Sequence, residues 1–204
     1  MIKNIFCRRR ILRNMPYSSE HKRKTRERIL DSALYLFTRH GYESITIDQL
    51  MEHAGLTRGA FYAHFANKSE VYAEAILSAL RRRPDLMPVD GLDEQDWLRQ
   101  LFFNYLSHDH VSQKSGACPL AFLATDVANR DPAARDAYTE VYKQLSRLIG
   151  DKLMQHADHR TAFAITAMMI GGVALCRALS ETETVEQVLD SCRQTALRLL
   201  EAPP

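Results

Sequence analysis

Residues 46–68, TIDQLMEHAGLTRGAFYAHFANK, constrain the fold of this chain of 204 residues more than any other segment. The first half carries an apolar stripe at helical spacing, formed by Ile47, Leu50 and Met51. Thr46 precedes the stripe and has a hydroxyl that can cap a helix N-terminus. Gly55 follows it and accepts the left-handed backbone conformation of a sharp turn. The segment therefore predicts a short helix that ends in a tight corner.

A second helix is predicted over residues 58–65, with Thr57 as its cap. Phe61 and Phe65 are four residues apart, so they share a face, and we assign that face to the core. Two short helices at a tight corner form a helix-turn-helix, which places its second helix in the major groove of DNA. The segment therefore predicts double-stranded DNA as the ligand of the N-terminal third.

The outer face of this second helix offers donors that suit DNA. Arg58 can reach a phosphate or make a bidentate contact to guanine. Thr57 and the backbone N–H of Gly59 lie where a helix N-terminus attracts an anion. The Tyr62 hydroxyl and the Lys68 ammonium suit phosphates, which position a protein on DNA without reading its sequence.

Three further residues extend the predicted contact set. Ala60 and Ala63 are small enough for the backbone to approach DNA, and they could touch a thymine methyl group. His64 could donate to a phosphate or a base. Any three-helix domain contains a similar corner, so the first alternative is a helical small-molecule-binding protein that keeps the fold without binding DNA.

The segment ILDSALYLFTRHGYESITIDQLMEHAGLTRGAFYAHFANKSEVYAEAIL closely resembles the N-terminal domain of TetR-family transcriptional regulators. The resemblance covers about a quarter of the chain, from Arg26 to Leu77. Three motifs carry it: A-x-x-L-F-x-x-x-G-Y from residue 33, T-I-x-x-L from residue 46 and R-G-A-F-Y-x-H-F-x-N-K from residue 58. Ala63 departs from the pattern, because many relatives have a large aromatic residue there.

The resemblance implies an all-α protein in which three N-terminal helices bind DNA. A fourth helix links them to a C-terminal helical domain for ligand binding and dimerisation. The family's DNA-binding positions carry over to Thr46, Thr57, Arg58, Gly59, Tyr62, His64 and Lys68. It also implies a ligand-responsive repressor that binds a palindromic operator as a homodimer and is released by an unknown small-molecule effector.

We expect three regions along the chain. Residues 1–18 are predicted to be a disordered basic extension, in which Met15 is a second possible start. Residues 19–67 are assigned to the helix-turn-helix domain and residues 68–204 to effector binding and dimerisation. Residues 1–68 contain 13 basic and six acidic residues, against 14 and 19 in the remainder, so positive charge gathers at one end and favours a polyanion.

Helical periodicity continues through the C-terminal region. Helices are expected over about residues 19–40, 68–83, 93–108, 118–127, 131–156, 159–179 and 184–200, with loops at 84–92 and 108–117. His108 and His110, in the second loop, are expected to be exposed. The first of the last two helices is apolar nearly all round and contains Gly171 and Gly172, so it is expected to be buried on more than one side. The resemblance to TetR-family regulators implies that the last two helices pair with their copies in a dimer.

A ligand pocket is expected among these helices. The segment GACPLAFLATDVANRDPAARDAYTEVY resembles a C-terminal pattern of AcrR-like members of the same family. Candidate lining residues are Trp97, Phe102, Tyr105, Cys118, Phe122, Tyr138, Tyr142, Met168, Met169 and Arg177. Each is also a plausible core residue. Cys118, at a predicted helix N-terminus, supports a second alternative, an electrophile or redox sensor, because that position lowers the pKa of a thiol.

Other classes of protein find little support in the sequence. No catalytic triad, carboxylate pair, phosphate loop or metal-ligand spacing is visible, so we expect no enzyme, cofactor or metal site. No apolar run reaches the ~20 residues of a membrane helix. Arg8, Arg9 and Arg10 lack the apolar stretch of an export signal. The four cysteines form no disulfide framework, which favours a cytoplasmic protein.

Overall fold

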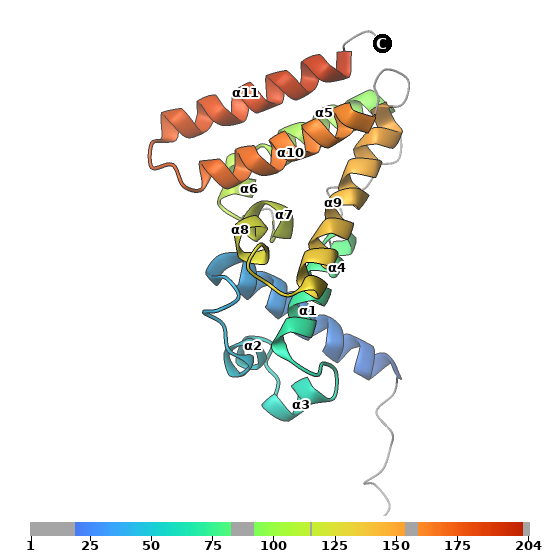
Figure 1. The fold of residues 1–204 in the computed structure, drawn as a ribbon, viewed down its shortest axis with the longest axis vertical. Helices are drawn as coiled ribbons and strands as arrows, with labels where there is room; N and C mark the ends of the chain where they lie inside the picture. The colour runs from blue at the N-terminus through green and yellow to red at the C-terminus, as the bar shows by residue number, and fades with distance from the viewer. Residues whose placement is uncertain (1–18, 83–91, 115, 154–158, 202–204) are drawn as a thin grey trace, which may run out of the picture.

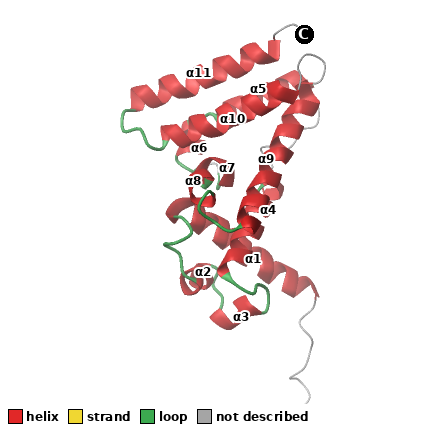
Figure 2. Ribbon diagram, viewed as in Figure 1, coloured by secondary structure: helices red, strands yellow, loops and turns green. Residues whose placement is uncertain are grey.

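The computed structural model describes residues 19–82, 92–114, 116–153 and 159–201, and the described residues form helices joined by loops and turns, without a strand (Figures 1 and 2). The extension expected at residues 1–18 lies outside this range, as do residue 83 of the expected fourth helix, residues 84–91 of the expected loop and residues 154–156 of the expected long helix. The all-α prediction is confirmed.

The helix-turn-helix segment forms as the local sequence indicates. The N-terminal helices are α1 (Ser19–His40), α2 (Ile47–His53), α3 (Arg58–Tyr62) and α4 (Lys68–Ser78), followed by the 3₁₀ helix η1 (Leu80–Arg82). Thr46 caps α2 as predicted, since its hydroxyl accepts from the backbone N–H of Gln49, whose side chain in turn accepts from the N–H of Thr46. Asn67 caps α4 in a similar way.

The C-terminal helices are α5 (Glu94–Tyr105), α6 (His108–Val111), α7 (Pro119–Phe122), α8 (Ala124–Val127), α9 (Pro132–Leu153), α10 (His159–Cys176) and α11 (Thr182–Glu201). Asp93 caps α5. Asp131 accepts a hydrogen bond from the backbone N–H of Ala134 at 3.0 Å, so it caps α9 as expected.

Several boundaries differ from the sequence prediction, and α4 and α5 both end earlier than expected, at Ser78 and Tyr105. α3 ends at Tyr62, because the N–H groups of His64 and Phe65 both bond to the carbonyl of Phe61 in a closing turn. The helix expected over 118–127 is divided at Leu123 into α7 and α8. α10 ends at Cys176, and α11 begins at Thr182.

The expected loop at 108–117 contains the short helix α6, which Ser107 caps through the N–H of His110. His110 is fully buried, so its predicted exposure is wrong. Its Nδ1 lies 2.6 Å from the carbonyl oxygen of Tyr105, and its ring meets the rings of Tyr105 and Phe122 edge-on. The carbonyl contact satisfies Nδ1, whereas Nε2 is buried without a hydrogen-bond partner among the described residues.

α4 holds the two ends of the molecule together. It packs against α1 on one side and α9 on the other, and its Val71, Tyr72 and Ile76 are fully buried. α2 and α3 lie at one end, whereas α5, α10 and α11 lie side by side at the other (Figure 1). α10 is long and apolar enough to pass a composition test for a membrane span, a test that the core helix of a soluble protein also passes.

Candidate nucleic-acid interface

The aromatic side chains of Phe61 and Phe65 anchor α3 to the core. Phe61 is fully buried and Phe65 is 2% exposed, which confirms that this face belongs to the core. Tyr62, on the opposite side, is 54% exposed. Gly55 has φ +64° in the turn before α3, and Arg28 of α1 donates to the carbonyl of Ala54 at 2.6 Å. The corner is thus fixed by one glycine and by the hydrogen bonding of Arg28 to the carbonyls of Ala54 and Gly55.

The residues at the start of α3 are open to solvent. Thr57, Arg58 and Gly59 are exposed. Thr57 occupies the N-cap position, but its hydroxyl makes no capping hydrogen bond. The local prediction that it caps α3 is therefore wrong for the side chain, and the hydroxyl remains oriented beside the helix N-terminus. Ala60 is half-buried and Ala63 is exposed.

Arg58 is held by its neighbours. Its Nη1 donates to Asp48 Oδ2 of α2 at 2.6 Å, and both side chains are more than half exposed. Hydrogen bonding with Tyr62, and then attraction to Asp48, raise the pKa of Arg58. The guanidinium is therefore always charged. Asp48 lies in the first turn of α2, where a negative charge also suits the helix dipole.

His64 faces the space between α3 and α1. Its Nδ1 is buried and has no hydrogen-bond partner in the part of the chain that the structure describes. Burial, followed by repulsion from Lys22 and Arg26, lowers the pKa of His64 below its ordinary value. The imidazole is therefore neutral at pH 7, and as a neutral ring it can offer one donor and one acceptor.

Lys68 lies at the start of α4, where its Nζ stands 4.0 Å from the centre of the Tyr42 ring. Arg130 approaches the same ring at 4.8 Å. Burial is the main cause that lowers the pKa of Lys68. Tyr42 therefore packs against two cations, and the predicted phosphate-binding lysine stands at the junction between α4 and the loop after α1.

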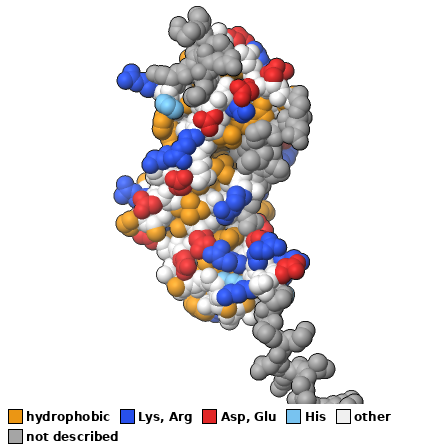
Figure 3. All heavy atoms as spheres, turned by 90° about the vertical axis from the view of Figure 1, so that its right-hand side faces the viewer, with side chains coloured by type: hydrophobic (Ala, Val, Ile, Leu, Met, Phe, Trp, Pro, Cys, Tyr) orange, Lys and Arg blue, Asp and Glu red, His pale blue; other side chains and the backbone are white. Residues whose placement is uncertain are grey.

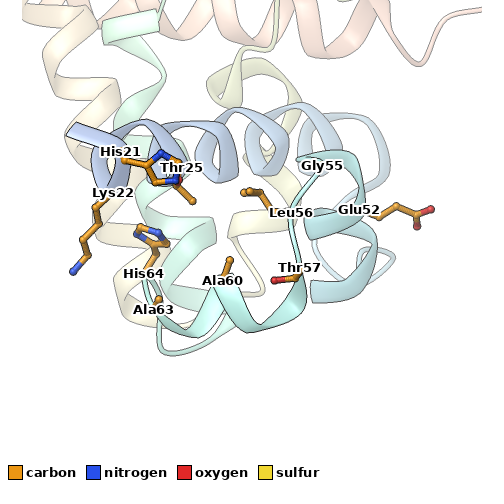
Figure 4. Close-up of a pocket in the computed structure, with 10 residues that line it drawn as sticks. All are labelled: His21, Lys22, Thr25, Glu52, Gly55, Leu56, Thr57, Ala60, Ala63 and His64. Carbon is orange, nitrogen blue, oxygen red and sulfur yellow. The ribbon is translucent and has the colours of Figure 1, made fainter. Parts of the chain in front are cut away.

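A groove of about 790 Å³ separates the N-terminal half of α1 from α3 (Figure 4). It is lined by His21, Lys22, Thr25, Glu52, Gly55, Leu56, Thr57, Ala60, Ala63 and His64. Four predicted DNA-contacting residues, Thr57, Ala60, Ala63 and His64, thus share one surface with α1. Sequence reasoning missed the contribution of α1, because its N-terminal end is polar on all sides and carries no motif.

The surface shown in Figure 3 mixes acidic and basic side chains, with hydrophobic side chains between them. Within residues 19–68 there are eight basic and six acidic residues, so most of the positive excess of the N-terminal third lies in residues 1–18, outside the described range. The exposed residues of α3 therefore indicate DNA binding more strongly than the net charge of the described residues does.

Asp126 of α8 connects the C-terminal helices with the N-terminal ones. Its Oδ2 accepts from the Tyr72 hydroxyl at 2.7 Å and from the backbone N–H of Tyr42 at 3.1 Å. Arg130, one turn later, pairs with Glu43. A second link runs from Gln113, whose side chain donates to the carbonyl of Thr38 at 3.0 Å. No sequence motif indicates these contacts.

The candidate ligand pocket is nearly closed. A cavity of about 10 Å³ lies among Ala79, Leu80, Tyr105, Cys118, Pro119, Leu120, Val141 and Leu145, and this volume holds roughly one water molecule. Only Tyr105 and Cys118 of the predicted lining residues border it. Cys118 is 4% exposed, and its Sγ lies 3.4 Å from the Tyr105 hydroxyl oxygen.

The other predicted lining residues do not border this cavity, and they pack in the core, hydrogen-bond to backbone carbonyls or contact an aromatic ring. Trp97, Phe102 and Met169 are buried in the core, and Met168 is half-buried. The hydroxyls of Tyr138 and Tyr142 donate to the carbonyls of Leu120 and Phe163. Arg177 lies 4.4 Å from the centre of the Phe122 ring.

Comparisons with known proteins agree with this architecture. The family model for bacterial regulatory proteins of the tetR family matches residues 29–75. The model for the C-terminal domain of LmrA/YxaF-like transcriptional regulators matches residues 98–191. Two separate parts of the chain therefore match models of transcriptional regulators.

Two curated relatives extend over most of the chain. The HTH-type transcriptional regulator SrpR of Pseudomonas putida is 30% identical over 191 residues, which cover 89% of this chain and 87% of SrpR. The HTH-type transcriptional regulator LmrA of Bacillus subtilis is 26% identical over 166 residues, which cover 74% of this chain and 85% of LmrA.

Solved structures share the fold at lower identity. The reduced form of Escherichia coli NemR has a TM-score of 0.70 at 18% identity, covering 84% of this chain and 96% of NemR. A TetR regulatory protein of Rhodobacter sphaeroides also has a TM-score of 0.70, at 19% identity, covering 86% of this chain and 98% of that chain. With its helix-turn-helix, its all-helical C-terminal region and a relative matched along nearly its whole length, this chain belongs to the TetR family of DNA-binding transcriptional regulators.

Proposed function

We propose that this regulator represses transcription by binding a palindromic operator as a homodimer, with α3 of each subunit in the major groove. The observation that carries the proposal is the geometry of α3, which buries Phe61 and Phe65 and leaves Thr57, Arg58 and Tyr62 exposed. Thr46, Gly59, Ala60, His64 and Lys68 complete the proposed contact set. The proposed boundary between the DNA-binding and effector domains is at residues 67–68.

An exposed apolar face on α10 supports dimerisation through α10 and α11. Phe163 is 46% exposed and Leu175 is 51% exposed. Ala167 and Gly171 are exposed between them, and a side chain added at Gly171 would meet nothing within 4 Å. A helix that is apolar by composition but only 44% buried gains from being covered by a second copy. The resulting two-fold symmetry matches that of a palindromic operator.

The effector is proposed to enter between α4, α5, α7 and α9, at the small cavity beside Tyr105 and Cys118. A ligand larger than water must displace α7 or its neighbours, because the cavity is almost closed. α8 follows α7 directly and carries Asp126, which bonds to Tyr72 and Tyr42. Movement at the cavity would thus reach α4 and the loop before α2. The effector shifts the population by no more than its differential affinity for the two states.

Sensing through Cys118 receives less support, because burial restricts the access of an electrophile to its thiol. If DNA release by an electrophile persists in Cys118→Ser, sensing at this residue is ruled out. As a DNA-binding regulator, the protein is proposed to act in the cytoplasm.

Selection of bound fragments from the source genome tests the proposed function. We expect enrichment of a palindromic sequence, and its affinity should fall steeply with rising salt because phosphate contacts release counterions. Arg58→Ala should weaken binding to the selected duplex by about tenfold or more. Arg147→Ala, a change at an arginine of α9 that is 64% exposed, should leave affinity unchanged. Equal binding of all fragments would contradict the proposal.

A further inference from the structure

Arg58 is the first residue of α3, and its long side chain has two possible destinations on DNA. It can lie along the phosphate backbone, where it adds affinity for any sequence, or it can present its planar fork to the edge of a guanine. A half-exposed arginine without a partner is free to take either. The choice therefore depends on what holds the guanidinium.

Asp48 holds it. The carboxylate lies in the first turn of α2, on the outer side of the corner, and accepts from Arg58 Nη1 at 2.6 Å. Both side chains are exposed, at 61% for Asp48 and 58% for Arg58. An exposed ion pair of this kind contributes little to stability, so stability is a poor reason for a carboxylate to stand on this surface.

We infer that Asp48 is a specificity-determining positioning residue, which orients the Arg58 guanidinium toward a base edge and keeps it off the phosphate backbone. The inference rests on the proposed function. Asp48 occupies one N–H of the arginine and Tyr62 also hydrogen-bonds with it, and the remaining N–H groups of the fork can face the acceptors of guanine. If Arg58 moved to a phosphate, the Asp48 carboxylate would remain unpaired beside the negatively charged backbone.

Removing the Asp48 charge frees Arg58 for phosphates and removes a repulsion. Binding to DNA of unrelated sequence should become tighter, while the preference for the operator should fall. A merely structural role in the first turn of α2 would instead weaken binding to all sequences alike, because the helix-turn-helix itself would be less stable.

The test compares the dissociation constants of the selected operator and of a scrambled duplex of equal length at fixed salt. Asp48→Asn should tighten binding to the scrambled duplex and reduce the ratio between the two affinities by about tenfold. Asp151→Asn, which makes the same change at an exposed aspartate in the last turn of α9, is the matched control. It should affect both duplexes by the same factor and leave the ratio unchanged.

A double-mutant cycle shows whether Asp48 acts through Arg58. In an Arg58→Ala background, Asp48→Asn should no longer change the ratio. Asp48→Glu keeps a carboxylate within reach of the guanidinium and should restore most of it. Three outcomes would each overturn the inference. The ratio could stay unchanged in Asp48→Asn, it could fall further in the double variant than in Arg58→Ala alone, or it could be as low in Asp48→Glu as in Asp48→Asn. If the wild type itself prefers no duplex, the proposed function fails as well.

Discussion

Gly55 shows how one residue sets the geometry of the corner between α2 and α3. Its φ of +64° is costly for residues with a Cβ. A Cβ built there would also stand 3.1 Å from Arg28 Nη2, the group that donates to the carbonyl of Ala54. We expect Gly55→Ala to lower the free energy of unfolding by about 1–2 kcal/mol, as measured by urea denaturation.

Gly59 provides the control at the same scale. It lies in helical backbone, and a Cβ there would approach nothing closer than Thr57 Oγ1 at 4.0 Å. Gly59→Ala should leave stability unchanged or raise it by up to about 1 kcal/mol. If both alanine variants had the same stability, the backbone at Gly55 would not be the constraint described above.

At the scale of elements, the contact between α4 and α8 depends on a buried phenol. Tyr72 is fully buried and donates to Asp126 at 2.7 Å. Burial, followed by this hydrogen bond, raises the pKa of Tyr72 far above its ordinary value. The folded state therefore favours the neutral phenol. Its contribution to stability is complete below the unfolded pKa of about 10 and is lost as pH rises above it.

Tyr72→Phe should therefore have two effects. At pH 7 it should lower the free energy of unfolding by about 2 kcal/mol, because a hydrogen bond to a carboxylate is lost. Above pH 10 its stability should fall less steeply than that of the wild type. Urea denaturation at pH 7 and pH 11 measures both. An identical slope above pH 10 would show that Tyr72 does not contribute to alkaline unfolding.

Tyr138→Phe is the matched variant for this interface. Burial also raises the pKa of Tyr138, but its hydroxyl donates to the carbonyl of Leu120 at 2.6 Å, within the C-terminal helices. Both variants should lose stability. Hydrogen exchange near Tyr42 should become faster in Tyr72→Phe than in a Tyr138→Phe protein of equal stability, because Tyr72, unlike Tyr138, shares Asp126 Oδ2 as acceptor with the Tyr42 N–H.

At the scale of the whole molecule, the exposed face of α10 determines the proposed assembly. We expect Leu175→Glu to place a charge in the dimer interface and to convert the protein into a monomer of 23.3 kDa. Light scattering after size exclusion measures the mass. Operator affinity should fall when the dimer is lost, because one recognition helix alone reads half of a palindrome.

Leu77→Glu on α4 is the corresponding control, since Leu77 is also a partly exposed leucine, at 37%. It should leave the mass of the wild type unchanged. A Leu175→Glu protein that stays dimeric would remove α10 from the proposed interface, although it would not alter the contacts described for α3.

Local patterns predicted some elements well and others poorly. The capping hydroxyl of Thr46 and the paired rings of Phe61 and Phe65 act within a few residues, so the sequence revealed the elements that they shape. The division of α7 from α8 and the burial of His110 escaped prediction. Both depend on how these short segments pack against distant parts of the chain, and periodicity carries no information about that.

By itself, the sequence determined the helical class, the corner at Gly55 and the exposed start of α3, because caps, turn residues and apolar spacing are short-range effects. Only the tertiary structure brought Asp126 to Tyr72, α1 to the groove beside His64, and Asp48 to Arg58. Tyr72 and Asp126 are 54 residues apart, and Asp48 and Arg58 are 10 residues apart across a turn. The groove joins the N-terminal half of α1 with residues as distant in sequence as His64. Their distances follow from the packing of whole helices, which fixes side-chain positions that no local pattern encodes.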